Sequence, residues 1–173
     1  KHLLSFEDVL PSIEAAESYD SESQKLVFDS DIYDAVNKEW LQPKPSYLEA
    51  YGTYMGLITL QYHEQRNLIE ISAEHISPIF AQELLTLIIR EVDDLLRQKD
   101  LQRSSESLEY LTSELSKTSL LEIKNSINQL MLSQLQTQMM AKISSNFVLN
   151  VIEPPFIPVK KSKPSRTLIC LFG

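Results

Sequence analysis

The sequence predicts an α+β fold: a small α/β base containing a β-hairpin, and a long projecting antiparallel α-helical hairpin. Three observations lead to this prediction. Only 3 of the 173 residues are glycine, too few for the glycine-rich loops and turns of phosphate-binding folds and β-sandwiches. Residues 57–63 and 68–74 alternate between apolar and polar side chains, as paired strands do. Residues 79–117 lack glycine and proline and repeat apolar side chains at helical spacing.

The first 55 residues are predicted to supply base and connecting segments. Ser5 is an N-cap candidate for a helix reaching about residue 17, in which Pro11 predicts a kink or a division into two short turns. Residues 26–28 (Leu-Val-Phe) indicate one short strand in an otherwise polar stretch. Gln-Pro-Lys-Pro at 42–45 indicates a linker.

A helix and a β-hairpin are predicted next. Ser46 and Glu49 have the spacing of a capping box, which predicts a short helix to about residue 55. Four residues, 64–67, join the two alternating segments and favour a hairpin. Because an isolated hairpin is only marginally stable, we expect a further strand to pair with it, supplied by residues 147–152 or by the region of Leu26.

The longest predicted element begins at Ser77-Pro78, an N-cap residue followed by proline at the first helical position. A helix from there to residue 117 would be about 60 Å long at about 1.5 Å per residue. Its apolar register slips near the middle, so residues 103–105 (Arg-Ser-Ser) predict a bend.

A second long helix is predicted from about residue 120 to 144, opened by a capping box of Ser119 and Glu122. Its apolar residues are expected on one broad face: Leu120, Ile123, Ile127, Leu130, Met131, Leu135 and Met139. Two long helices joined by a short turn fold back on each other, so we expect an antiparallel arm.

The charge and composition divide the chain further. Residues 1–117 carry a net charge of −12, residues 118–153 of 0 and residues 154–173 of +4. The negative front has the wrong sign for nucleic acid, which we exclude as a partner. The predicted organisation is a base and connector (1–77), an extended helical hairpin (78–146), a returning base strand (147–159) and a basic, proline-containing tail (160–173).

The basic residues of the tail are Lys160, Lys161, Lys163 and Arg166, and an apolar run, 168–172, follows them. This pattern indicates the beginning of a truncated transmembrane segment, since a full span needs about 20 apolar residues. Together with a first residue that is Lys rather than Met, it suggests a domain excised from a longer protein. We expect such a piece, with net charge −8, to self-associate weakly on its own.

The charged face of the long helix is a candidate interface between copies. Its candidate residues are Arg90, Glu91, Asp93, Asp94 and Arg97. The alternative is a solvated face with local pairs such as Asp93–Arg97. On a helix, Glu91 and Asp94 share a face while Asp93 points elsewhere. Charge reversal at Arg90 or Arg97 is expected to alter assembly without disturbing the fold.

We predict no catalytic, cofactor or metal site. His63 lies beside the hairpin turn and His75 precedes a helix, where structural roles are expected. Cys170 has no histidine neighbour in the sequence, and no nucleophile elbow or phosphate-binding lysine motif is found. The sequence therefore favours a protein that is not an enzyme.

Residues 71–78 (Ile-Ser-Ala-Glu-His-Ile-Ser-Pro) are less generic. Further such segments are 97–100 (Arg-Gln-Lys-Asp), 110–111 with 115–120, 151–155 (Val-Ile-Glu-Pro-Pro), 160–166, and 32–34 with Trp40. In this joint order, from about Tyr19 to the end, the chain resembles the Wzz-type chain-length determinants, which are polysaccharide co-polymerases of Gram-negative inner membranes.

The resemblance implies a periplasmic domain between two transmembrane helices, with a membrane-proximal α/β base and a long helical arm, assembled as homo-oligomeric rings. It implies regulation of O-antigen chain length together with a Wzy-type polymerase and lipid-linked glycan, without hydrolytic or transferase activity. The basic tail departs from the positive-inside tendency, and could instead meet lipid headgroups or an anionic glycan. The alternative is a periplasmic coiled-coil adaptor or scaffold of a polysaccharide export system.

Overall fold

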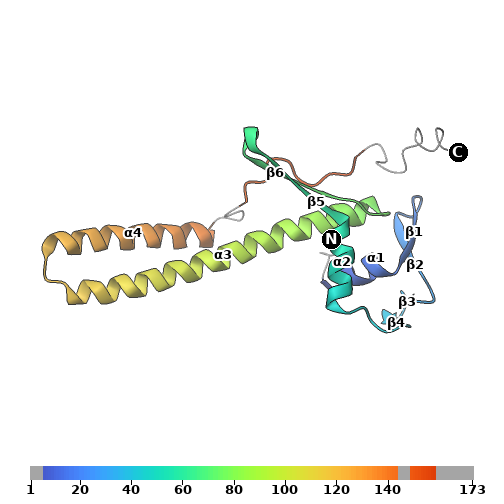
Figure 1. Ribbon diagram of the computed structural model, residues 1–173, viewed down its shortest axis with the longest axis horizontal. Coiled ribbons are helices and arrows are strands. Elements are labelled where there is room, and N and C mark those ends of the chain that lie inside the picture. Colours follow the sequence, from blue (N-terminus) through green and yellow to red (C-terminus); the bar gives the residue numbers. More distant parts are fainter. Residues whose placement is uncertain (1–5, 144–148, 159–173) are drawn as a thin grey trace. The chain divides into compact units, whose positions relative to one another are not determined.

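The computed structural model describes residues 6–143 and 149–158, and in them the chain is mixed α+β, as predicted (Figure 1). This part of the chain contains four α-helices and three two-stranded antiparallel sheets. It divides into two compact units. The first extends to Leu87 and resumes at Pro154, and the second is Ile88–Glu153. The long helix α3 contributes to both.

The first unit begins with α1 (Phe6–Glu14), which continues through Pro11 as one helix. The predicted division into two short turns is therefore wrong. Proline lacks an N–H and gives up one helical hydrogen bond, but the Pro11 carbonyl still accepts a bond from the Ala15 N–H at 2.9 Å. Helix α1 also brings Val9 into the core of this unit, with Ala15, Tyr33, Phe80 and Leu84.

Two small sheets follow in a stretch that we predicted to hold only one short strand. Strand β1 (Ala16–Asp20) pairs with β2 (Lys25–Phe28), and β3 (Tyr33–Asp34) pairs with β4 (Glu39–Trp40). The polar residues between them close turns: the Asp34 carboxylate, for example, accepts the Val36 N–H at 2.8 Å. The Tyr33 ring also packs against the rings of Phe28 and Trp40, at 5.5 and 5.3 Å between centroids.

Helix α2 (Tyr47–Leu57) and the hairpin agree with the prediction. Ser46 caps α2 and forms the capping box with Glu49. Strands β5 (Ile58–His63) and β6 (Leu68–Ala73) are antiparallel and are joined by a 3₁₀ turn over Glu64–Arg66. Asn67 ends that turn in the left-handed region, with φ of 50°, which asparagine tolerates better than most residues.

The predicted third strand of this hairpin is not formed by the described residues. The Leu26 region pairs with β1, and residues 149–158 form no strand. The N–H of Leu149 donates to the Asp93 carboxylate at 3.1 Å, so it is not available to a strand partner. Proline at 154, 155 and 158 removes further donors from this segment. Residues 147 and 148 of the predicted strand lie outside the described residues.

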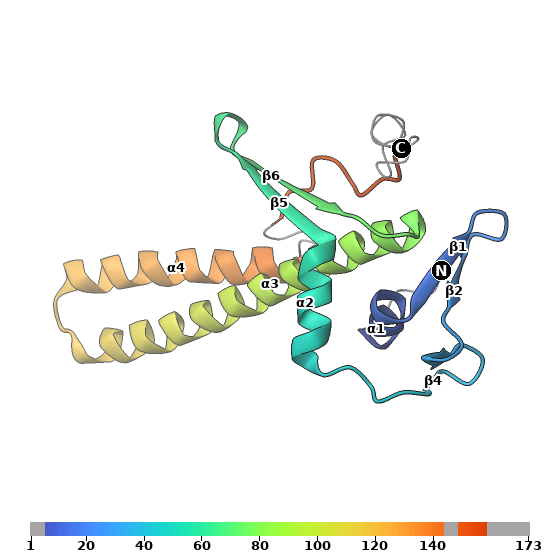
Figure 2. The same cartoon turned by 45° about the vertical axis from the view of Figure 1, so that its right-hand side comes forward.

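The long helices are α3 (Pro78–Lys117) and α4 (Leu121–Ile143), which lie side by side and antiparallel where Arg97 and Ser104 bond Ala141 and Gln134 (Figures 1 and 2). Helix α3 begins at the predicted proline, behind Ser77, whose hydroxyl accepts the Phe80 N–H at 3.2 Å. The second capping box is wrong. Because α4 begins at Leu121, its N-cap position is Leu120, whose carbonyl accepts the Lys124 N–H at 3.1 Å.

Candidate functional site

The contact between α3 and α4 buries polar as well as apolar residues. Among the described residues of this unit, the buried ones are Asp93, Ser104, Ile127 and Ala141. Ser104 is 1% exposed, and its hydroxyl donates a hydrogen bond to the Gln134 carbonyl at 2.9 Å. Beside it, the Gln138 amide donates to the Ser105 hydroxyl at 3.0 Å. Helix α3 is continuous through residues 103–105, where we predicted a bend, and the small serines are where the two helices approach.

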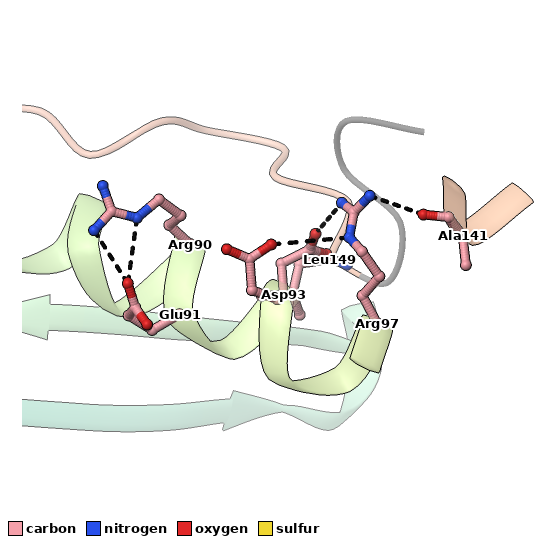
Figure 3. Close-up of polar contacts among 7 residues, drawn as sticks. Arg90, Glu91, Asp93, Arg97, Ala141 and Leu149 are labelled. Carbon is pink, nitrogen blue, oxygen red and sulfur yellow. Dashed lines mark hydrogen bonds and ion pairs between the residues drawn. The ribbon is translucent and has the colours of Figure 1, made fainter. Parts of the chain in front are cut away.

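Asp93 and Arg97 form a polar latch at the end of α4 (Figure 3). Their side chains are 9% and 19% exposed and pair at 2.8 Å. Arg97 Nη1 also donates to the Ala141 carbonyl at 2.9 Å, and the other Asp93 oxygen accepts the Leu149 N–H at 3.1 Å. Ala141 is in the last turn of α4, where carbonyls lack helical partners and favour a positive charge. The latch thus caps α4 and holds the chain that leaves it.

The candidate interface residues therefore divide into two groups. Asp93 and Arg97 are engaged inside the chain, so we now expect charge reversal at Arg97 to disturb the fold, contrary to the prediction from the sequence. Arg90 and Glu91 form an exposed pair at 3.1 Å, and the Asp94 side chain is 54% exposed. The separation of Asp93 from Glu91 and Asp94 around the helix is confirmed, and these last two remain available at the surface.

Both described histidines make structural contacts. His63 pairs with Glu70 at 2.8 Å, from opposite strands of the β5–β6 hairpin. His75 lies 2.9 Å from the Ser12 carbonyl through Nε2, and its Nδ1 accepts the Ser77 N–H at 3.1 Å. Its ring packs on Phe80 at 4.5 Å between centroids. Burial lowers the pKa of His75, which agrees with a neutral ring that accepts a hydrogen bond at Nδ1.

A surface that the sequence reasoning missed lies on α4. We predicted one broad apolar face that contained both Ile127 and Leu135. Ile127 is buried, whereas Leu135 and Met139 are 45% and 59% exposed. Helix α4 therefore has two apolar faces, of which only one contacts α3. The sequence does carry a sign of the second face, because positions 121, 125, 128, 132, 135 and 139 are spaced four and three residues apart. The prediction instead placed Leu135 and Met139 on the same face as Ile127.

The basic tail residues Lys160, Lys161, Lys163 and Arg166 lie outside the described residues, as do Cys170 and the predicted start of a transmembrane segment. Within residues 6–143 and 149–158, no group of three or more histidine, cysteine or acidic residues could hold a metal ion. In the same part of the chain, no helix combines the length and the apolar character that crossing a bilayer requires.

The fold and these contacts define a mixed α+β chain whose helical hairpin is closed by a polar latch and leaves a second apolar face exposed. No protein-family model matches the chain, and no curated protein or solved structure matches it.

Proposed function

We propose that this protein regulates polysaccharide chain length without being an enzyme. In this proposal it acts on O-antigen at the bacterial inner membrane, with its described part in the periplasm. It works as a homo-oligomer beside a Wzy-type polymerase and the lipid-linked glycan. The α/β unit is the membrane-proximal base, and the helix pair is the arm.

The observation that carries this proposal is the second apolar face of α4. Leu132, Leu135 and Met139 are 58%, 45% and 59% exposed on a helix whose other face is already packed on α3. Exposed apolar patches of this kind are typical of protein–protein contact surfaces. A protein that works as an assembly needs such a surface. The segments that resemble Wzz-type proteins favour an assembly of the Wzz kind.

The test is a strain from which the gene is deleted, with surface polysaccharide resolved on a gel. We expect loss of the modal chain length, restored by the wild-type gene and by a variant with Ser133→Glu, an exposed position away from the apolar face. A variant with Leu135→Glu and Met139→Glu should not restore it. Unchanged modality together with failed secretion would contradict the proposal and favour an export scaffold.

A further inference from the structure

The outward surface of α4 has the pattern of a coiled-coil seam. Positions 121, 125, 128, 132, 135 and 139 are spaced four and three residues apart, which keeps them on one side of a helix. Together with Ile143 they form what we call the outer α4 seam: Leu121, Asn125, Asn128, Leu132, Leu135, Met139 and Ile143. Its five apolar residues, in that order, are 72%, 58%, 45%, 59% and 77% exposed.

This outer seam is more apolar than the face that contacts α3. The inner face carries Ile127, Met131, Gln134, Gln138 and Ala141, of which three of five are apolar, against five of the seven residues of the outer seam. An ordinary surface helix has the reverse arrangement, with its polar side toward water. Exposure of the more apolar side costs hydrophobic free energy, so the outer seam is expected to be covered by another helix.

Helix α3 carries a matching outward row on the side opposite Ser104. We call it the outer α3 seam: Ile88, Val92, Leu95, Lys99, Gln102, Glu106, Tyr110, Ser113 and Lys117. Val92, Leu95 and Tyr110 are 39%, 66% and 66% exposed. Spacings of three and four residues also dominate this row. Each of the two helices therefore presents a seam on a side that does not contact the other helix.

We propose that the outer α4 seam binds the outer α3 seam of a second copy of this chain. The choice rests on the proposed function, because copies in one membrane point the same way and α3 of a neighbour is then antiparallel to α4. Two different surfaces meet in this contact, so it is heterologous and can close a ring. A contact between two α4 seams would be isologous and could not continue beyond a pair.

The height of each residue along the pair is set by two contacts within the chain. Arg97 lies level with Ala141, and Ser104 with Gln134. Because the helices are antiparallel, moving two residues along each helix from these pairs places Met139 level with Lys99 and Leu132 level with Glu106. In a neighbour at equal height, the aliphatic stems of Lys99 and Glu106 can cover these apolar side chains while their charged ends stay in water.

Charge favours this partner as well. The only charged residues of α4 are Glu122, Lys124 and Lys142. At equal height, Glu122 lies near Lys117 of the second copy. Lys142 lies on the flank of the seam that faces Glu91 and Asp94 of the second copy. Both juxtapositions pair opposite signs, whereas parallel pairing of two α4 helices would set Glu122 and Lys142 against their own copies.

Cysteine crosslinking in cells tests this contact on the protein as encoded, in a background with Cys170→Ser. One copy carries Met139→Cys and a co-expressed copy carries Lys99→Cys, and copper phenanthroline is the oxidant. We expect a dimer band that is at least tenfold stronger than that from Met139→Cys alone. Replacing Met139→Cys by Ser133→Cys in the mixture is the matched control and should give only the background band.

Two outcomes would overturn the inference. Equal crosslinking by Met139→Cys alone would assign the outer α4 seam to a second α4 helix. Absence of any crosslink in the mixture, in cells whose polysaccharide banding is normal, would show that the two outer seams do not meet. The polysaccharide gel of the deletion strain tests the proposed function separately. A failed crosslink therefore counts against the contact between seams only, and unchanged polysaccharide counts against the proposed function.

Discussion

Asp93 and Arg97 are four residues apart on α3, a spacing that on an exposed helix contributes only a few tenths of a kcal/mol. In this chain the pair is mostly buried and also bonds Ala141 and Leu149. Burial changes what the same two residues do: they fasten α4 and the chain after it, instead of presenting charge to a neighbour.

Arg97→Ala should therefore destabilise the helix pair by about 3 kcal/mol, because it removes the cation paired with a buried carboxylate and the cap of α4. The matched control is Arg90→Ala. Its side chain is 40% exposed and pairs with exposed Glu91, so we expect a change within about 0.5 kcal/mol. Urea unfolding followed by circular dichroism measures both, and equal losses would contradict the latch.

The histidine contact predicts a pH dependence. Burial lowers the pKa of His75 below its unfolded value of about 6.5, so the folded state binds fewer protons than the unfolded state near that pH. The stabilisation is present above the unfolded pKa and is lost as pH falls through the folded pKa. Thermal melts at pH 7.5 and 5.0 should show a smaller loss for His75→Gln than for wild type, and an unchanged loss would exclude this role.

At the scale of the elements, the two predicted capping boxes differ in outcome. Ser46 and Glu49 form theirs, with the Ser46 N–H donating to the Glu49 carboxylate at 2.8 Å. Helix α2 buries none of its residues, so it depends on its cap more than a packed helix does. Ser119 lies two residues before α4 and is not at the N-cap position.

We therefore expect Ser46→Ala to destabilise the chain by about 1 kcal/mol, a typical loss for an N-cap serine. Ser119→Ala should change stability by less than about 0.5 kcal/mol, as an ordinary surface substitution does. Chemical denaturation of the two variants side by side is the measurement. A larger loss at Ser119 would show that the second box contributes after all.

The close approach of α3 and α4 depends on a small residue at 104. Ser104 is almost fully buried and donates across the pair. Ser104→Leu should overpack the contact and cost about 1–3 kcal/mol, whereas Ser113→Leu, at an exposed position, should be nearly neutral. Thermal unfolding distinguishes them, and a neutral Ser104→Leu would mean that the helices can separate without loss.

At the scale of the whole molecule, assembly is expected to be weak for the 173-residue chain in solution. Its net charge is −8, and copies of like charge repel. In the proposed function, confinement of the copies to one membrane would raise their effective concentration. Light scattering at micromolar concentration should therefore find mostly monomer, and a tight ring that is insensitive to salt would contradict this expectation.

The sequence by itself determined where most elements begin and end. The start of α3 at Pro78, the cap of α2 and the β5–β6 hairpin all depend on residues a few positions apart, so their signals are local and readable. Between Ala16 and Trp40 the strands are short and polar, so they were mostly missed. Their pairing depends on aspartate-closed turns and on the packing of Tyr33.

Only the tertiary structure decided which faces meet. Both sides of α4 carry apolar residues, so periodicity could not select the side with Ile127 over the side with Leu135. The latch could not be predicted from the sequence either, because Arg97 bonds Ala141 and Asp93 bonds Leu149 at separations of 44 and 56 residues. Contacts at such separations leave no local pattern: they exist only after the helices have folded back and removed these groups from water.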